Sequence, residues 1–290
     1  MPFVDIDGIK THYQLLGGGP PLLLLEPVGI DATMSRQSPN RVWRGFQPLD
    51  ALARDFRLIA YDQRESGQSG GRIEPLTWEL VARHAKGLLD YLEVEAALLL
   101  GACVGCATAL AIAAHFPERC RALFLHWPVG GFRWMKEGRE NFERHIAYTR
   151  EWGLAGVVER ARRSSDFWSD PEAGPWASVI GSDPEFAESY APQNQQDYLD
   201  IVNQSRDNLF CDAMPSGASC EQLMTISVPA SIMAGNDAWH ATSAAHILRE
   251  LMPEAKLSPL MPRQQNAMTI VKWIYESAAA CGAARSSIAA

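Results

Sequence analysis

One cysteine in an apolar part of the sequence lies between two glycines, in a pattern that can carry a nucleophile. The residues are Gly101-Ala102-Cys103-Val104-Gly105, within the apolar run 98–115. They match the pattern G-x-S-x-G of a nucleophile elbow, with cysteine in the place of serine. In an elbow a buried strand ends in a tight turn, whose glycines avoid steric clashes, and a helix begins beneath the nucleophile. We therefore predict a strand that ends at Leu100 and a reactive thiol at Cys103.

The amide of the residue after the cysteine could stabilise negative charge at this turn. The backbone N–H of Val104 would lie at the start of the expected helix, beside the thiol. Amide donors and the helix dipole at a helix N-terminus favour a thiolate or an oxyanion. We expect Val104 to be one oxyanion donor. We also expect Cys103 to ionise more readily than a serine, since an ordinary thiol has a pKa of about 8.5.

Short apolar strands alternate with helical segments along the chain. A hairpin is predicted from 3–6 and 10–16, joined by the turn Asp7-Gly8. Apolar runs that are typical of buried strands occur at 22–25, 56–61, 96–100, 122–126, 226–234 and 256–261. Helical spacing is found at 77–92, 242–251 and 267–279. This order predicts an α/β fold with a doubly wound, mostly parallel sheet.

The character of the sequence changes after the strand that ends at His126. From 132 to 222 the residues are charged, helical in pattern and rich in aromatic side chains. We predict a core formed by 1–131 and 223–290, with 132–222 as an inserted helical cap. The apolar inner face of such a cap suits a small-molecule pocket, and Trp127, just before it, is a candidate substrate-binding residue.

The composition limits which classes of partner and which cellular compartment we expect. With 290 residues, of which 47% are hydrophobic, the chain can bury a large core. The formal net charge of -8 argues against nucleic acid or an anionic membrane as a partner. The cysteines lack the spacing of a secreted disulfide framework and the first residues lack a leader, so we expect a cytoplasmic protein. The expected partner is a small molecule, and a homodimer is an open alternative.

Several features recur in the order found in one known family. They are the opening hairpin, the apolar strand before Glu26-Pro27-Val28-Gly29, the run Tyr61-Asp62-x-Arg64-x-x-Gly67-x-Ser69, the elbow, and His115-Phe116-Pro117-Glu118-Arg119 after the elbow helix. In this order they resemble the α/β-hydrolase fold superfamily over nearly the whole chain. The resemblance implies a hydrolase-like enzyme with no cofactor, although the same fold hosts esterases, dehalogenases, lyases and inactive binding proteins.

The resemblance also implies a catalytic triad of nucleophile, acid and histidine, in that chain order. Cys103 matches the nucleophile, and Asp237, after a core strand, matches the acid. The loop 262–266, after the last strand, contains no histidine, and neither does the chain beyond it. The candidates for the base are therefore His240, three residues past Asp237, and His126 at the end of a strand. Of these two we favour His240.

Glu26 takes the place where the resembled proteins usually carry a histidine before a glycine. It could protonate a substrate oxygen if burial raised its pKa, or it could pair with an arginine such as Arg64 or Arg36. We favour the ion pair. Val28, in the same loop, is expected to provide the second oxyanion N–H.

Three functions remain open on this fold. The first, which we favour, is a cysteine-nucleophile hydrolase of a small activated acyl compound such as an ester, thioester or lactone. The second is a non-hydrolytic lyase or C–C bond enzyme, and the third is a catalytically silent ligand-binding protein. We expect no metal site, because Cys103-x-x-Cys106 has no second such pair and Cys106 should face the core.

Overall fold

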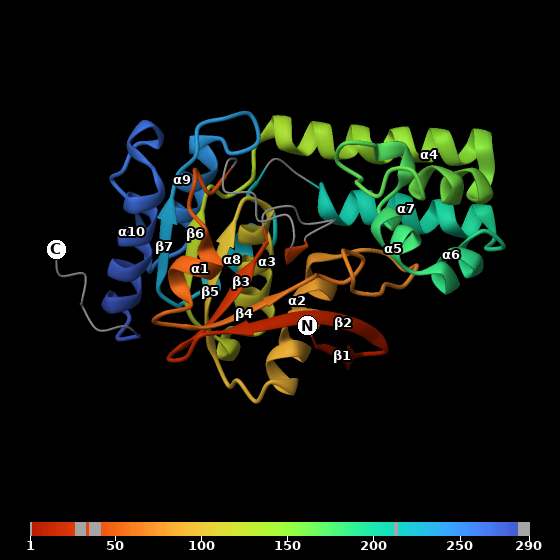
Figure 1. The fold of residues 1–290 in the computed structure, drawn as a ribbon. Coiled ribbons are helices and arrows are strands. Elements are labelled where there is room, and N and C mark those ends of the chain that lie inside the picture. Colours follow the sequence, from red (N-terminus) through yellow and green to blue (C-terminus); the bar gives the residue numbers. More distant parts are fainter. Residues whose placement is uncertain (1, 27–32, 35–41, 212–213, 284–290) are drawn as a thin grey trace.

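A single sheet forms the centre of the protein. The computed structural model describes residues 2–26, 33–34, 42–211 and 214–283. Within these residues eight strands form the sheet in the order β1-β2-β4-β3-β5-β6-β7-β8 (Figure 1). The strands are β1 Phe3–Ile6, β2 Ile9–Leu16, β3 Pro21–Leu25, β4 Arg57–Tyr61, β5 Ala97–Ala102, β6 Cys120–His126, β7 Ala230–Met233 and β8 Ala255–Leu257. β2 is antiparallel to β1 and β4, whereas the pairs from β4 to β8 are parallel.

Helices of the core pack on both faces of this sheet. They are α1 Pro48–Leu52, α2 Trp78–Tyr91, α3 Val104–His115, α8 Cys220–Thr225, α9 Thr242–Leu251 and α10 Ala267–Ala280. Successive strand residues point to opposite faces. Leu23 and Leu99 therefore pack with α2, α3, α8 and α9, while Leu22 and Leu98 pack with α1 and α10. The sheet is doubly wound and mostly parallel, which confirms the predicted fold class.

The apolar run around the cysteine is divided between a strand and a helix. β5 ends at Ala102 and α3 begins at Val104, so the run is not one continuous helix. Two other predicted strands are longer than the observed ones, since β7 begins only at Ala230 and β8 ends at Leu257. Proline precedes β7 at position 229 and follows β8 at position 259, and its missing N–H cannot join a strand ladder.

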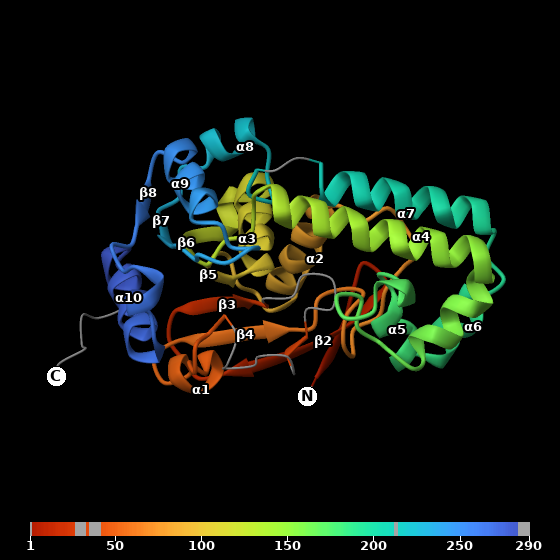
Figure 2. The ribbon, with the colours of Figure 1, turned by 90° about the horizontal axis from the view of Figure 1, so that it is seen from above.

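Residues 132–222 contain helices but no strand among their described positions. The helices are α4 Phe132–Ala161, η3 Pro171–Ala173, α5 Ala177–Ser182, α6 Pro184–Tyr190 and α7 Gln195–Leu209. α4 and α7 lie side by side, and Figure 2 shows them beyond one end of the sheet. Gly153, with φ 67° and ψ 178°, interrupts α4 and divides it into two helical segments. The predicted boundary at Gln222 lies within α8, which packs on α3 and α9.

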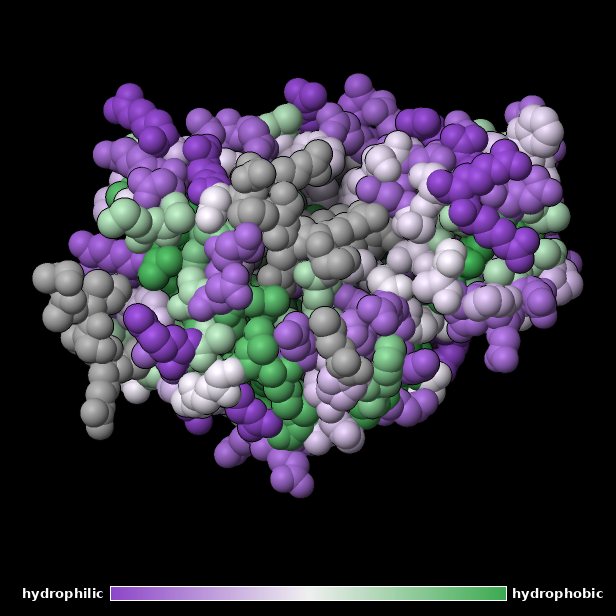
Figure 3. Space-filling model, viewed as in Figure 1, coloured by the Kyte–Doolittle hydropathy of each residue, from purple (hydrophilic) through white to green (hydrophobic). Residues whose placement is uncertain are grey.

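The surface seen in Figure 3 is mostly hydrophilic, with smaller apolar areas between the charged side chains. This agrees with a net charge well away from zero. In the part of the chain that the structure describes, no helix is both long enough and apolar enough to span a bilayer.

Candidate active site

The turn at Cys103 has the geometry of a nucleophile elbow. Cys103 joins β5 to α3 with φ 53° and ψ -121°, a strained conformation for a residue that carries a side chain. A Cβ atom at Gly101 would lie 2.4 Å from the carbonyl oxygen of Gly105. A Cβ atom at Gly105 would lie 2.2 Å from the carbonyl oxygen of Leu25. Because only glycine fits at these two positions, the pattern around the cysteine is a steric requirement of the turn.

The backbone of the neighbouring strand holds Cys103 in place, and an apolar cluster covers it. Its N–H donates to the carbonyl oxygen of His126 at 3.0 Å. Cys103 is 5% exposed and belongs to a cluster that includes Val104 and, from α4, Trp134. Val104 is the first residue of α3, where backbone N–H groups have no acceptor within the helix. The predicted oxyanion donor is therefore an amide of the first helical turn, adjacent to the thiol.

Cys106 lies one helical turn farther along α3 and faces the core. Its thiol donates to the carbonyl oxygens of Gly101, at 3.2 Å, and His126, at 3.4 Å. Burial raises the pKa of the Cys106 thiol well above its usual value. Among the residues that the structure describes, no group of three or more His, Cys, Asp or Glu side chains is arranged to hold a metal ion.

Asp237 and His240 form a hydrogen-bonded pair in the loop between β7 and α9. The Nδ1–H group of His240 donates to Asp237 Oδ1 at 2.7 Å. The backbone N–H groups of Trp239 and His240 donate to the same oxygen at 3.0 Å each. Since Nδ1 carries the proton, Nε2 holds the basic lone pair, and it is buried with no hydrogen-bond partner in the described part of the chain. A general base needs this tautomer and this unused nitrogen.

Burial and the carboxylate of Asp237 shift the pKa of His240 in opposite directions. Burial lowers the pKa of His240, and the bond to Asp237 raises it, which leaves the pKa below that of an ordinary histidine. For Asp237, partial burial raises the pKa, but the bonds from His240 and the two backbone amides bring it below its usual value. At neutral pH the ring is therefore neutral and the carboxylate ionised, so the pair can accept a proton.

His126, the other candidate base, lies fully buried among aromatic rings. Its Nε2–H group donates to the carbonyl oxygen of Val42 at 2.9 Å, and the ring stacks on Trp43 with centroids 5.4 Å apart. Burial lowers the pKa of His126 to about 4. A base with such a low pKa holds a proton poorly at neutral pH, and its position inside the packing favours a structural role.

Trp127 lies between the elbow and the Asp237–His240 pair. Its neighbour His126 accepts the hydrogen bond from Cys103, and its own indole ring packs against His240 with centroids 5.4 Å apart. The Arg44 guanidinium lies 4.9 Å from the centroid of the same indole. Trp127 is only 5% exposed, and with φ 54° its backbone is in the left-handed region. The elbow and the pair are therefore connected through the ends of two adjacent strands.

The loop 262–266, where the resembled family would carry its histidine, contains the buried polar side chain of Gln265. Gln265 is 3% exposed, and its Oε1 accepts from Trp127 Nε1 at 2.5 Å. Its amide donates to the carbonyl oxygens of Ala234, at 2.9 Å, and Leu260, at 3.0 Å. The neighbouring Asn266 caps α10 through the N–H of Thr269. An amide cannot act as a base, so Gln265 and Asn266 contribute hydrogen bonds and cannot replace the histidine.

Glu26 is buried next to the elbow helix, at 5% exposure. The pKa of Tyr61 is raised, first by the burial of its own side chain and second by the negative charge of Glu26. Arg64, one of the two expected partners of Glu26, forms ion pairs with Glu65 at 2.8 Å and Glu74 at 2.5 Å. The other expected partner, Arg36, lies outside the described residues, as does the predicted oxyanion residue Val28.

Sequence reasoning missed Trp239, which ties the Asp237–His240 loop to the helices of 132–222. Its indole Nε1–H donates to Glu137 on α4, and its ring lies 6.0 Å from that of Trp134 and 5.8 Å from that of Trp168, between centroids. The only signal in the sequence is that a tryptophan precedes His240. Its partner Glu137 is 102 residues away along the chain, too far for a local pattern to reveal.

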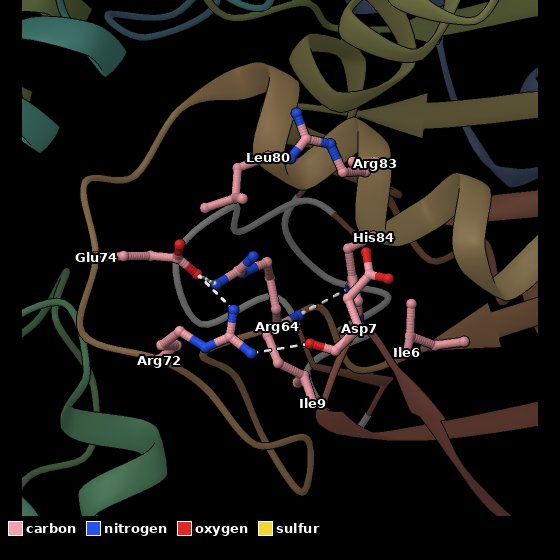
Figure 4. Close-up of a pocket in the computed structure, with 9 residues that line it drawn as sticks. All are labelled: Ile6, Asp7, Ile9, Arg64, Arg72, Glu74, Leu80, Arg83 and His84. Carbon is pink, nitrogen blue, oxygen red and sulfur yellow. Dashed lines mark hydrogen bonds and ion pairs between the residues drawn. The ribbon is translucent and has the colours of Figure 1, made fainter.

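A pocket of about 380 Å³ lies between the opening hairpin and α2 (Figure 4), and Cys103 is not among its lining residues. It is lined by Ile6, Asp7, Ile9, Arg64, Arg72, Glu74, Leu80, Arg83 and His84. Arg64 is paired as described above, Arg72 donates to the Asp7 carbonyl at 2.9 Å, and Arg83 donates to Glu79 at 2.7 Å. Because its arginines are already paired within the protein, the pocket gives no specific signal for a ligand.

Comparison with known sequences agrees with this architecture. Residues 37–167 match a family model described as alpha/beta hydrolase fold. The chain is 28% identical to a 2-hydroxy-6-oxo-2,4-heptadienoate hydrolase of Pseudomonas putida, over 68% of this chain and 70% of that one. It is 35% identical to a 2-hydroxymuconate semialdehyde hydrolase of Pseudomonas sp. strain CF600, over 42% of this chain and 41% of that one. For some of its curated relatives, therefore, the match spans less than half of their length.

Solved structures show the same fold over nearly the whole chain. The enol-lactonase of Burkholderia xenovorans LB400 covers 96% of this chain, with a TM-score of 0.61 and 18% identity. A hydrolase of Pseudomonas aeruginosa PA01 covers 95%, with a TM-score of 0.62 and 22% identity. At such low identity these likenesses concern the fold alone.

The sheet order, the helices on both faces and the strained glycine-flanked turn define a doubly wound α/β protein with a nucleophile elbow. The family model, which matches residues 37–167, and the structural neighbours agree that this is the alpha/beta hydrolase fold.

Proposed function

We propose that the protein is a hydrolase of small activated acyl compounds, such as esters, thioesters or lactones, and that Cys103 is its nucleophile. The observation that carries the proposal is the strained elbow, in which a cysteine takes the nucleophile position between two glycines that no larger residue could replace. Such backbone strain recurs at catalytic positions, because it projects the side chain toward a bound substrate.

The proposed reaction has two steps. In the first, His240 Nε2 takes the thiol proton and the Cys103 sulfur attacks the substrate carbonyl, whose oxygen accepts from the Val104 N–H. The C–O or C–S bond to the leaving group breaks, and the imidazolium returns the proton to that group. In the second step, His240 deprotonates a water molecule that attacks the thioester. The C–S bond then breaks, which releases a carboxylic acid and restores the thiol.

The surroundings of the thiol support an apolar acyl group. Cys103 shares an apolar cluster with Trp134 and Phe142 of α4 and with Leu76. We propose that 132–222 forms a cap over the elbow and that this cluster excludes water from the reaction. The names of the relatives, a heptadienoate hydrolase and a semialdehyde hydrolase, are consistent with hydrolysis on this fold.

Acylation of the cysteine is the direct test. Because Cys211 is exposed, a Cys211→Ser background would limit labelling at that position. After rapid mixing with p-nitrophenyl acetate, peptide mass spectrometry should find one acetyl group on Cys103, and a burst of p-nitrophenol of about one equivalent should precede turnover. The Cys103→Ala variant should lose the burst, and Cys106→Ala should keep it.

Two other results would contradict a cysteine hydrolase and favour another function. Turnover that survives in Cys103→Ala would contradict a cysteine nucleophile and would favour a lyase that uses the pocket without an acyl intermediate. If neither a burst nor turnover occurs over a panel of esters, thioesters and lactones, while a ligand still raises the melting temperature, the protein is a binder.

A further inference from the structure

The buried amide of Gln265 is fully used within the protein. Its oxygen accepts from the Trp127 indole at 2.5 Å, and its nitrogen donates to two backbone carbonyls at 2.9 and 3.0 Å. The two carbonyls belong to Ala234, just after β7, and Leu260, after β8. Gln265 therefore ties the ends of two strands to the indole, across 138 residues of sequence in the case of Trp127.

A histidine could not make the same set of bonds. A neutral imidazole has one donor and one acceptor, whereas the Gln265 amide supplies one acceptor and two donors. The loop 262–266 therefore does more than lack a histidine, because Gln265 holds three groups that one imidazole could not hold together.

The indole held by Gln265 is packed tightly against His240. A Cβ atom at Gly235 would lie 2.6 Å from His240 Cβ and 3.0 Å from Trp127 Cδ2, so no side chain fits between these groups. On the same indole, the Arg44 guanidinium lies 4.9 Å from the ring centroid. Trp127 itself keeps a left-handed backbone, with φ 54°, that is costly for a residue with a side chain.

We propose that Gln265 is a positioning residue that acts through Trp127: it fixes the indole wall that orients the His240 ring and keeps water from it. The proposal rests on the proposed function only in so far as His240 is the base, because the effect on the ring itself does not require catalysis. Gln265 does not touch the reacting atoms, and so its contribution lies in orientation and exclusion of water.

If the Trp127 indole were less firmly held, the pKa of His240 would change in a direction that can be derived from its surroundings. Burial is the largest influence on the His240 ring and lowers its pKa. Among the described residues, the charged or titratable groups near this region are Asp237 on the same loop, His126 at the end of β6, Arg44 beyond the indole, and Glu137 of α4, which accepts from the adjacent Trp239. None of them changes when Gln265 loses its hydrogen bonds. Water that reaches the ring would therefore raise the pKa of His240 toward the value of an ordinary histidine.

A double-mutant cycle tests the proposal. Gln265→Met keeps the volume of the side chain and removes its hydrogen bonds, while Trp127→Phe keeps an aromatic ring and removes the indole N–H. Each single variant should move the NMR titration midpoint of His240 upward and reduce p-nitrophenyl acetate turnover about tenfold to a hundredfold, as expected for misplaced catalytic groups. The double variant should be little worse than either single one, because both changes remove the same contact. Gln264→Met, at an exposed neighbouring position, should change neither readout.

The outcomes separate this proposal from the proposed function. If the His240 titration is unchanged in both single variants, or if their effects add fully, the positioning role of Gln265 is wrong. If the titration shifts as expected but Cys103→Ala retains turnover, Gln265 still positions the ring and the cysteine-hydrolase proposal fails. Should Gln265→Met not fold, Trp127→Phe alone decides, since it tests the same hydrogen bond from the other side.

Discussion

The elbow at Cys103 and the loop at Asp237–His240 are built in opposite ways. The elbow depends on close backbone contacts, since Cβ atoms at Gly101 and Gly105 would lie 2.4 Å from the carbonyl oxygen of Gly105 and 2.2 Å from that of Leu25. The loop depends on side chains from distant parts of the chain, Trp127 on one side and Glu137 on the other. A short sequence motif therefore marks the proposed nucleophile, whereas packing between distant segments surrounds the proposed base.

The largest expected effect tests the loop by removing its ring nitrogen. His240→Gln should reduce the rate of p-nitrophenyl acetate turnover by about 10²- to 10⁴-fold and abolish the acidic limb of the rate profile, because general base catalysis contributes about that much. Steady-state kinetics from pH 5 to 9, alongside His126→Gln, would measure it. If His126→Gln instead removes the acidic limb while His240→Gln retains it, the base is His126 and the comparison above describes the wrong loop.

The next largest effect is on stability, and it tests whether the elbow requires glycine at position 105. Gly105→Ala places a Cβ atom 2.2 Å from the Leu25 carbonyl oxygen, and we expect it to lower the free energy of unfolding by about 3 kcal/mol or more. Urea denaturation would measure the loss. Gly18→Ala is the matched control, because a Cβ atom there has nothing within 4 Å. Equal stability of the two variants would mean that the elbow adapts to a side chain, contrary to a strict steric origin.

A third effect tests the burial of His126 through stability instead of rate. Burial lowers the pKa of His126 to about 4 in the folded state, against about 6.5 when unfolded. As the pH falls below about 6.5, the unfolded chain takes up the proton first, so His126 makes the protein less stable between roughly pH 6.5 and 4. His126→Gln should therefore reduce the slope of unfolding free energy against pH by up to about 1.4 kcal/mol per pH unit in this range. An unchanged slope would show that the ring is not buried as described.

The smallest effect concerns the contact between the loop and α4. Trp239→Phe removes the hydrogen bond to Glu137 and keeps a ring against Trp134 and Trp168. Glu137 is only partly buried, so we expect a change below about 1 kcal/mol in stability and a rate change of less than about fivefold. Glu137→Gln, which keeps an acceptor, should have less effect still. A loss as large as that of His240→Gln would mean that α4 controls the base more strongly than Trp127 does.

Much of the fold and part of the candidate site could be predicted from the sequence, because both depend on patterns of nearby residues. Strand and helix patterns are local, and so the doubly wound sheet, the turn at Cys103 and the core-facing Cys106 follow from nearby residues. The sequence favours His240 over His126 because His240 lies close to Asp237, and in the structure these two residues are hydrogen-bonded. Gln265 as a hydrogen-bond partner of Trp127 could not be found in this way, because the contact joins segments 138 residues apart.

The placement of Asp237 and His240 within four residues of one loop also has an evolutionary consequence. When acid and base lie on separate loops, each loop must keep its length for the other to remain in reach. Here one short segment carries both proposed groups, and the carboxylate of Asp237 accepts from backbone amides of the same segment, so the two groups would move as one unit. A single loop graft between related chains would therefore transfer the proposed acid and the proposed base together, with their spacing intact.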